Sequence, residues 1–263
     1  MRHMFNFIRA NLYKGFKSKT FVVLMMVSIV CTAIMILLAN GVATGTMNQE
    51  LSNMIFLFSD SSMLALLGAM LASIIIGAEF ETKWFHQAIV AGYSRLQIVI
   101  GKAITYWVLL ICVTLPYAIG VVLVRVMVLD VDFGMQGAGF LNIVNGGNDL
   151  SLMRFVTVLA VMLLIYVGQL SLTILFAFVA KKAMLIIPMF YIVSALSGQV
   201  SLYAASVPAL EKALNATPFG SQFIALSPNA SNGLLLEAVV VSVSFMIVVS
   251  LLAFVTFRKA ELK

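Results

Sequence analysis

Charged residues are scarce in this chain, and the scarcity decides its class. Asp, Glu, Lys and Arg make up only 10% of the 263 residues, whereas 62% are hydrophobic and the mean hydropathy is +1.10. A soluble globule needs more polar surface than this composition supplies. We therefore expect an integral membrane protein.

Catalytic motifs are absent as well. The phosphate-binding pattern GxxxxGK[ST] does not occur, and the nearest run, "GFKS" at 15–18, has the wrong spacing. There is no HExxH motif. Both histidines, His3 and His86, lie outside the long apolar runs, so a serine nucleophile within those runs would lack a base. We expect the chain not to be an enzyme by itself.

Cysteine is nearly absent. Cys31 and Cys112 both fall inside apolar runs, where a lone thiol packs as a small apolar side chain. Two such thiols provide neither a disulfide framework nor a metal site, so we predict no bound metal and no cofactor on the chain itself. The first apolar run has no small-residue cleavage site directly after it, so we expect no cleavable signal peptide.

The chain contains instead six uncharged, mostly apolar windows of about 20 residues, the length of a helix that crosses a bilayer core of about 30 Å. The predicted spans are 20–39, 61–78, 103–124, 155–180, 183–200 and 238–257. The alternating pattern of a membrane β-barrel is missing. We predict an all-α membrane protein with an N-terminal segment over 1–19 and a six-helix transmembrane domain over 20–263.

The polar residues inside these windows are few and uncharged. Proton- or sodium-coupled transport needs titratable groups near the middle of the bilayer, and the windows contain none, which disfavours ion coupling. Gln169 lies near the middle of the fourth window with Ser171 beside it. These side chains are predicted either to bond between helices or to face a transport path.

Small residues recur every four positions in the second window, at Ala65, Ala69, Ser73 and Gly77. They form one helix face that another helix can approach closely. The approaching helix belongs either to the same chain or to a second copy.

Basic residues separate cleanly by side. Thirteen of the 16 lysines and arginines fall in the four segments 1–19, 79–102, 181–182 and 258–263. Because short cytoplasmic loops retain Lys and Arg, these segments and both termini are predicted to be cytoplasmic. The same distribution accounts for the net charge of +6 without a nucleic-acid partner.

The N-terminal segment has helical periodicity. Phe5, Ile8, Leu12 and Phe16 are spaced by three or four residues, and basic residues occupy the other faces. This pattern predicts an amphipathic helix lying in the membrane surface. The alternative is a disordered basic leader that only sets the topology.

The segment 79–102 is predicted to fold rather than to serve as a bare connector. The second helix is expected to continue through Ala91, with Gly92 as its C-terminal cap. Ser94 and Gln97 form a capping-box pattern for a new helix that begins at Arg95. The aromatic residues before Gly92 favour a docking surface for a soluble protein, or else a tryptophan of the membrane interface.

This segment resembles the cytoplasmic loop of the type-2 ABC transporter permeases. The matching residues form the run Glu79, Trp84, then "AGYSRLQI" at 91–98 and "GK" at 101–102. The family has a "GT" step where this chain has Lys83-Trp84. The resemblance extends to the basic surface helix, the six spans, both termini inside and a large outer segment before the last span.

The resemblance implies a permease subunit of an ATP-driven exporter in the bacterial cytoplasmic membrane. Two cytoplasmic ABC ATPase subunits, which use ATP and Mg, would drive it, and a second permease, identical or a sister subunit, would complete the path across the membrane lipid. The cargo class is amphipathic or hydrophobic: first a peptide toxin or antimicrobial peptide, with a role in resistance, and second a lipid or drug. The alternative is a membrane scaffold or sensor subunit that transports nothing and docks a different cytoplasmic protein.

The resemblance also assigns residues. The loop would act as a coupling helix whose contacts with the ATPase are Trp84, Phe85, His86 and Gln87. Glu79, Arg95 and Lys102 would brace it through an ion pair whose partners the sequence does not assign. The segment before the sixth span would form re-entrant helices at the outer mouth, with a plain surface loop as the alternative.

Overall fold

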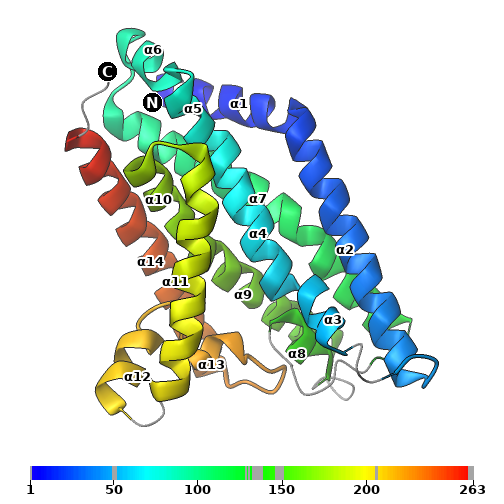
Figure 1. Cartoon of the computed structure of the whole chain (residues 1–263). Coiled ribbons are helices and arrows are strands. Elements are labelled where there is room, and N and C mark those ends of the chain that lie inside the picture. The colour runs from blue at the N-terminus through cyan, green and yellow to red at the C-terminus, as the bar shows by residue number, and fades with distance from the viewer. Residues whose placement is uncertain are drawn as a thin grey trace.

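The computed structural model describes residues 2–48, 52–127, 129, 131, 139–145, 151–204 and 207–259. Within these ranges the chain is helical and has no β-strand (Figure 1). Parts of 125–154 and of 199–233, which come before the fourth and the sixth span, lie outside the described residues, so the predicted re-entrant segment is described only in part.

Six helices of the described chain are long and apolar enough to cross a membrane, which confirms the six predicted spans. They are α2 (Lys19–Ala43), α4 with the π-helical turn η2 and α5 (Asp60–Glu81), α7 (Arg95–Val126), α9 with α10 (Leu152–Ala180), α11 (Ala183–Ala204) and α14 (Asn232–Lys259). Most extend beyond the predicted windows, because a helix does not end where its apolar residues end.

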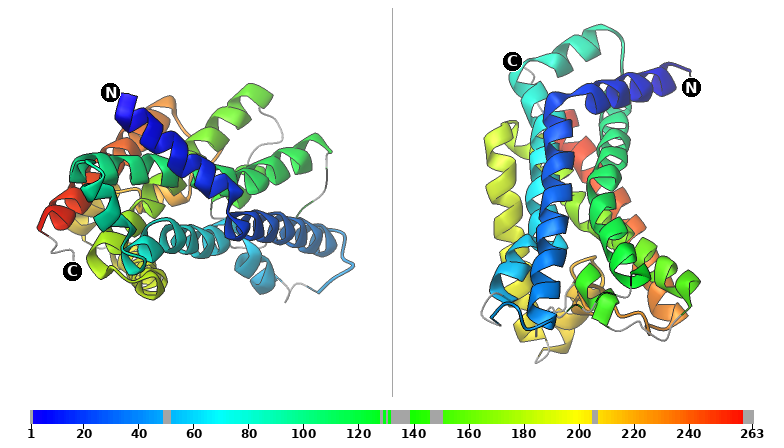
Figure 2. Two further views of the ribbon diagram at one scale, coloured as in Figure 1. Left: turned by 90° about the horizontal axis from the view of Figure 1, so that it is seen from above. Right: turned by 90° about the vertical axis from the view of Figure 1, so that its right-hand side faces the viewer.

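The shorter helices of the described chain lie at the two ends of the bundle (Figures 1 and 2). The first end carries α1 (Arg2–Lys17) and α6 (Trp84–Val90). The other carries α3 (Ser52–Phe58), α8 (Phe140–Asn145), α12 (Pro208–Asn215) and α13 (Ser221–Ile224). We call these the basic end and the opposite end.

The described parts of the four basic segments meet at the basic end. Lys14 of α1 pairs with Glu79 of α5, and the Ala183 amide at the start of α11 donates to the carboxylate of Glu81. Arg95 of α7 donates to the backbone at the end of α14. Residues predicted to share one side of the membrane are therefore in contact at one end of the fold.

Burial divides the spans into a central and a peripheral set. In α9 with α10, 61% of the most apolar window is buried, against 11% in α11 and 22% in α14. The central helices thus form the packed core. Most of the surface of α11 and α14 remains free to contact lipid or another subunit.

The small-residue face of the second span packs within the chain. A side chain on Gly77 would meet the backbone of Ala183 in α11, and the Ser73 hydroxyl donates to the Ala183 carbonyl over 2.9 Å. Gly68 faces Leu170 of α9 in the same way. In this chain the face serves helix packing inside the subunit.

Candidate functional site

The candidate site is the folded turn between the second and third spans, and it differs from the predicted continuous helix. The prediction that the second helix continues through Ala91 is wrong. Its segment α5 ends at Glu81, and Lys83 adopts a left-handed conformation with φ of 56°, which stops helical hydrogen bonding. A separate seven-residue helix, α6, follows.

The end of α6 and the start of α7 (Arg95–Val126) are capped as the sequence predicts. Gly92 has φ of 92°, and the bonds from Gly92 N–H to Ile89 O and from Tyr93 N–H to Ala88 O complete a Schellman cap. The Ser94 hydroxyl accepts from the Gln97 amide while the Gln97 side chain accepts from the Ser94 amide. Both the glycine cap and the capping box are confirmed.

Helix α6 has one buried and one exposed face. Phe85 and Ala88 are buried, Trp84 is half-buried, and His86 and Gln87 are exposed. Phe85 therefore requires a correction as a predicted partner contact. It is 1% exposed, because its ring inserts between spans instead of facing outward.

The ring of Phe85 belongs to an aromatic cluster beneath α6. It lies 4.4 Å from the Phe80 ring, 5.9 Å from the Phe178 ring and 5.5 Å from the Phe257 ring, measured between centroids. Phe80 comes from the second span, Phe178 from the fourth and Phe257 from the sixth. Aromatic pairs at these separations add stability beyond the area they bury. The cluster joins α6 to three spans.

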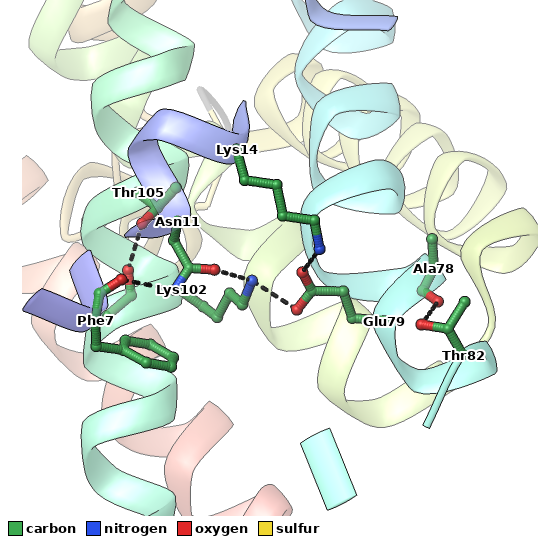
Figure 3. A network of polar contacts seen from close by, with 9 residues as sticks. Phe7, Asn11, Lys14, Ala78, Glu79, Thr82, Lys102 and Thr105 are labelled. Carbon is green, nitrogen blue, oxygen red and sulfur yellow. Dashed lines mark hydrogen bonds and ion pairs between the residues drawn. The ribbon is translucent and has the colours of Figure 1, made fainter. Parts of the chain in front are cut away.

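A buried ionic network lies beside this cluster (Figure 3). The Glu79 carboxylate is 2.6 Å from the Lys102 ammonium group and 2.9 Å from that of Lys14. Lys102 also donates to the Asn11 side chain over 2.5 Å, and its ammonium lies 4.4 Å from the Trp84 ring centroid. Glu79 and Lys102 are 5% and 1% exposed, so each needs the other to offset the cost of burying charge.

Arg95 does not join this ionic network. Its guanidinium donates to the carbonyl oxygens of Phe257 and Arg258, over 2.8 and 2.6 Å, at the end of α14. A cation is favourable there because the last carbonyls of a helix carry negative partial charge. Of the three predicted bracing residues, Glu79 and Lys102 bind each other and Arg95 ties α7 to α14.

Three residues with contacts at this site escaped prediction: Asn11 and Lys14 of the network, and Glu81, whose carboxylate accepts from the Ala183 amide. Asn11 follows Phe7 by one helical turn, and both are buried against α7, where Gly101 leaves room for the Phe7 ring. The sequence offers one signal for Asn11, because it is a polar residue one helical turn after an aromatic residue. Phe7 and Asn11 lie on another face of α1 than the one predicted to be apolar, whose Phe5 and Phe16 remain exposed.

The two polar residues predicted in the fourth span have separate surroundings. The Ser171 hydroxyl accepts from the Trp107 indole over 2.9 Å, which is a bond between helices. The Gln169 side chain donates to the Pro218 carbonyl over 2.8 Å and lines a cavity of about 220 Å³. That cavity has a mixed wall that includes Ser61, Tyr166, Ser194 and Phe219. Gln169 thus reaches both a backbone partner and open space.

Comparison with known proteins does not assign the chain to a family. No family model matches the chain, and no curated protein matches it either.

Proposed function

We propose that this chain is the membrane-spanning permease subunit of an ABC exporter and that α6 is its coupling helix. One observation carries the proposal. Helix α6 exposes His86, Gln87 and Val90 at the basic end, while its buried face is joined to several spans. A force applied to this small helix would be passed to the transmembrane helices and not absorbed by a flexible loop.

The contacts of the candidate site connect α6 to the spans. The aromatic cluster links α6 to the second, fourth and sixth spans, and the pair of Glu79 and Lys102 links the second span to the third. Packed and buried contacts of this kind shift between discrete arrangements and do not deform gradually. Closure of two cytoplasmic ATPase subunits on ATP and Mg would tilt the spans by this route.

The backbone at Lys83 supports the resemblance on which the proposal rests. Lys83 occupies the position of the family's glycine, and its φ of 56° lies in the region that glycine adopts without strain. This chain therefore has a lysine where the family has glycine, but the backbone at that position keeps a conformation that suits glycine. Beside it, a groove of about 360 Å³ between α1 and α6, lined by Trp84 and Gln87, offers room for a side chain of the ATPase.

The proposed setting is the bacterial cytoplasmic membrane, with the basic end and both termini in the cytoplasm and α1 in the membrane surface. The basic residues gathered at that end and the exposed rings of Phe5, Tyr13 and Phe16 support this orientation. The weakly buried surfaces of α11 and α14 leave room for a second permease, identical or a sister.

The cargo is proposed to be amphipathic or hydrophobic, first a peptide toxin or antimicrobial peptide and second a lipid or drug. The support is the cavity at Gln169, whose wall combines hydroxyl and amide groups with apolar side chains and carries no formal charge. The contact of Pro218 with Gln169, near the middle of the fourth span, supports a re-entrant segment before the sixth span.

The test is co-purification of the tagged full chain with a cytoplasmic ABC ATPase subunit of its own host. We expect His86→Ala together with Gln87→Ala to remove most of the bound ATPase and the cargo-stimulated ATP hydrolysis. Lys182→Ala, an exposed change in the other turn at the basic end, is the matched control and should leave both unchanged. Recovery of a different soluble protein with the unaltered chain would favour the scaffold or sensor alternative.

A further inference from the structure

An apolar groove of about 690 Å³ runs between α2 and α7 (Figure 2 shows the two helices). It begins at the corner between α1 and α2, beside Phe16 and Phe21, and reaches Ile36 and Leu123 near the other end of these spans. Among the described residues that line it, Thr32 provides the only hydroxyl, and that hydroxyl already donates to the Ser28 carbonyl over 2.8 Å. A ligand in this groove would therefore present hydrocarbon to it.

The groove is built into the contact between the two helices. The Ser28 hydroxyl donates to the Val113 carbonyl of α7 over 2.7 Å, which holds the helices together at that level. Further along, a side chain on Gly120 would come within 2.5 Å of the Thr32 methyl group, so α2 and α7 also touch there. Pro116, which lines the groove, removes one helical hydrogen bond from α7. The groove lies alongside these contacts and needs no opening movement.

Two lysines are close in sequence to the residues that line the groove at its basic end, since Lys17 follows Phe16 and Lys19 comes two residues before Phe21. Lys17 and Lys19 lie on either side of the corner between α1 and α2 and are exposed. The Lys17 ammonium sits 4.9 Å from the Tyr13 ring centroid. Within the described part of the chain, the lysines that pair with a carboxylate are Lys14 and Lys102, both on Glu79. The corner thus offers positive charge that no described carboxylate neutralises.

We propose that the groove between α2 and α7 is a binding site for an anionic phospholipid of the leaflet at the basic end. One acyl chain lies in the groove, and the phosphate group is held by Lys17 and Lys19. The charge at the corner selects this occupant over a second copy of the chain. A copy standing in the same orientation would bring its own basic end to the two lysines, and the described carboxylates at that end are already engaged. Glu79 pairs with Lys14 and Lys102, and Glu81 accepts from the Ala183 amide. The site is independent of the proposed transport function.

The test uses the full chain, extracted with mild detergent and loaded with defined phosphatidylglycerol or phosphatidylcholine, and native mass spectrometry counts the retained lipid. We expect one phosphatidylglycerol per chain and a preference over phosphatidylcholine of about tenfold. Lys17→Gln with Lys19→Gln should abolish this preference. Lys182→Gln with Lys259→Gln, at the same end but away from the groove, should retain it.

A second pair of variants tests the groove. Ala33→Phe fills it and should abolish retention of either lipid, whereas Ala195→Phe, an exposed change on α11 that lines no part of the groove, should not. Retention unchanged by Ala33→Phe overturns the site. Equal binding of both lipids by the unaltered chain also overturns it. A disulfide between two copies of an Ala33→Cys variant, formed with loss of the lipid, assigns the groove to a second copy instead.

Discussion

Two buried carboxylates, at the two ends of the second span, are held in opposite ways. Glu79 at the basic end contacts the ammonium groups of Lys14 and Lys102. Asp60 at the opposite end has no cation within ion-pair distance in the described chain. Its Oδ2 atom accepts from the Tyr166 hydroxyl and, over 2.8 Å, from the Phe140 amide. One end is joined by paired charge and the other by neutral donors.

The two ends of the fold also differ in which residues adopt positive φ. Among the described residues, the two that have positive φ and are not glycine are Lys83 and Lys181, both in turns of the basic end. The basic end also has one glycine in this conformation, Gly92, whereas the opposite end has Gly45 and Gly139, and Gly139 sits tightly against Asp60 and Tyr166. The basic end thus combines charge burial with backbone strain. Such features persist where surrounding contacts hold them, and they gather at functional sites.

The largest effect is expected from Lys102→Met. Removing the ammonium leaves Glu79 buried beside Lys14 alone, a loss of about 3–5 kcal/mol in the free energy of unfolding. Denaturation with SDS in mixed micelles measures it. Adding Glu79→Gln to this variant should restore about 1–3 kcal/mol, because the unpaired charge is then gone. A double variant no more stable than Lys102→Met would contradict the pairing.

The two carboxylates should respond differently to the loss of charge. Glu79→Gln leaves the buried Lys102 ammonium without its carboxylate and should lower stability by about 3 kcal/mol. Asp60→Asn retains an oxygen that accepts from Tyr166 and Phe140, so its effect should stay within about 1 kcal/mol. The same denaturation series compares them. Equal losses at the two positions would remove the distinction between the two ends.

The two arginines that hold the ends of α14 provide a smaller test. Arg95 donates to carbonyls at the C-terminal end, whereas Arg154 donates to the Ala230 carbonyl and to the Asn232 side chain at the N-terminal end. Because a helix favours cations at its C-terminus, Arg95→Gln should cost about 1 kcal/mol, more than Arg154→Gln. Hydrogen exchange of the last turn of α14 should rise in Arg95→Gln only.

The smallest effect should come from relieving strain at the turn. Lys83→Gly removes the cost of a left-handed lysine and should raise stability by about 0.5 kcal/mol after the entropy of the added glycine is counted. Lys181→Gly, with φ of 54°, is the matched variant and should behave alike. Thermal unfolding in detergent measures both. A loss at Lys83 alone would mean that its side chain contributes contacts that outweigh the strain.

Sequence reasoning succeeded where the signal is local. The six spans, the glycine cap at Gly92 and the capping box of Ser94 and Gln97 each depend on residues within a few turns of one another. It failed at Lys83, because a lysine carries no sign that its backbone will be left-handed. It also failed for Phe85, since exposed and buried faces cannot be separated on a seven-residue helix whose neighbours are unknown.

By itself the sequence determined that the chain has six helices long and apolar enough to cross a membrane, and it predicted that the basic segments share one side. The reason is that hydropathy and charge act on each segment independently through the bilayer. Only the tertiary structure decided that Glu79 binds Lys14 and Lys102, that Arg95 holds the end of α14, and which face of α6 is free. These pairings join residues far apart in the chain, and they are set by how the helices pack, which no local pattern records.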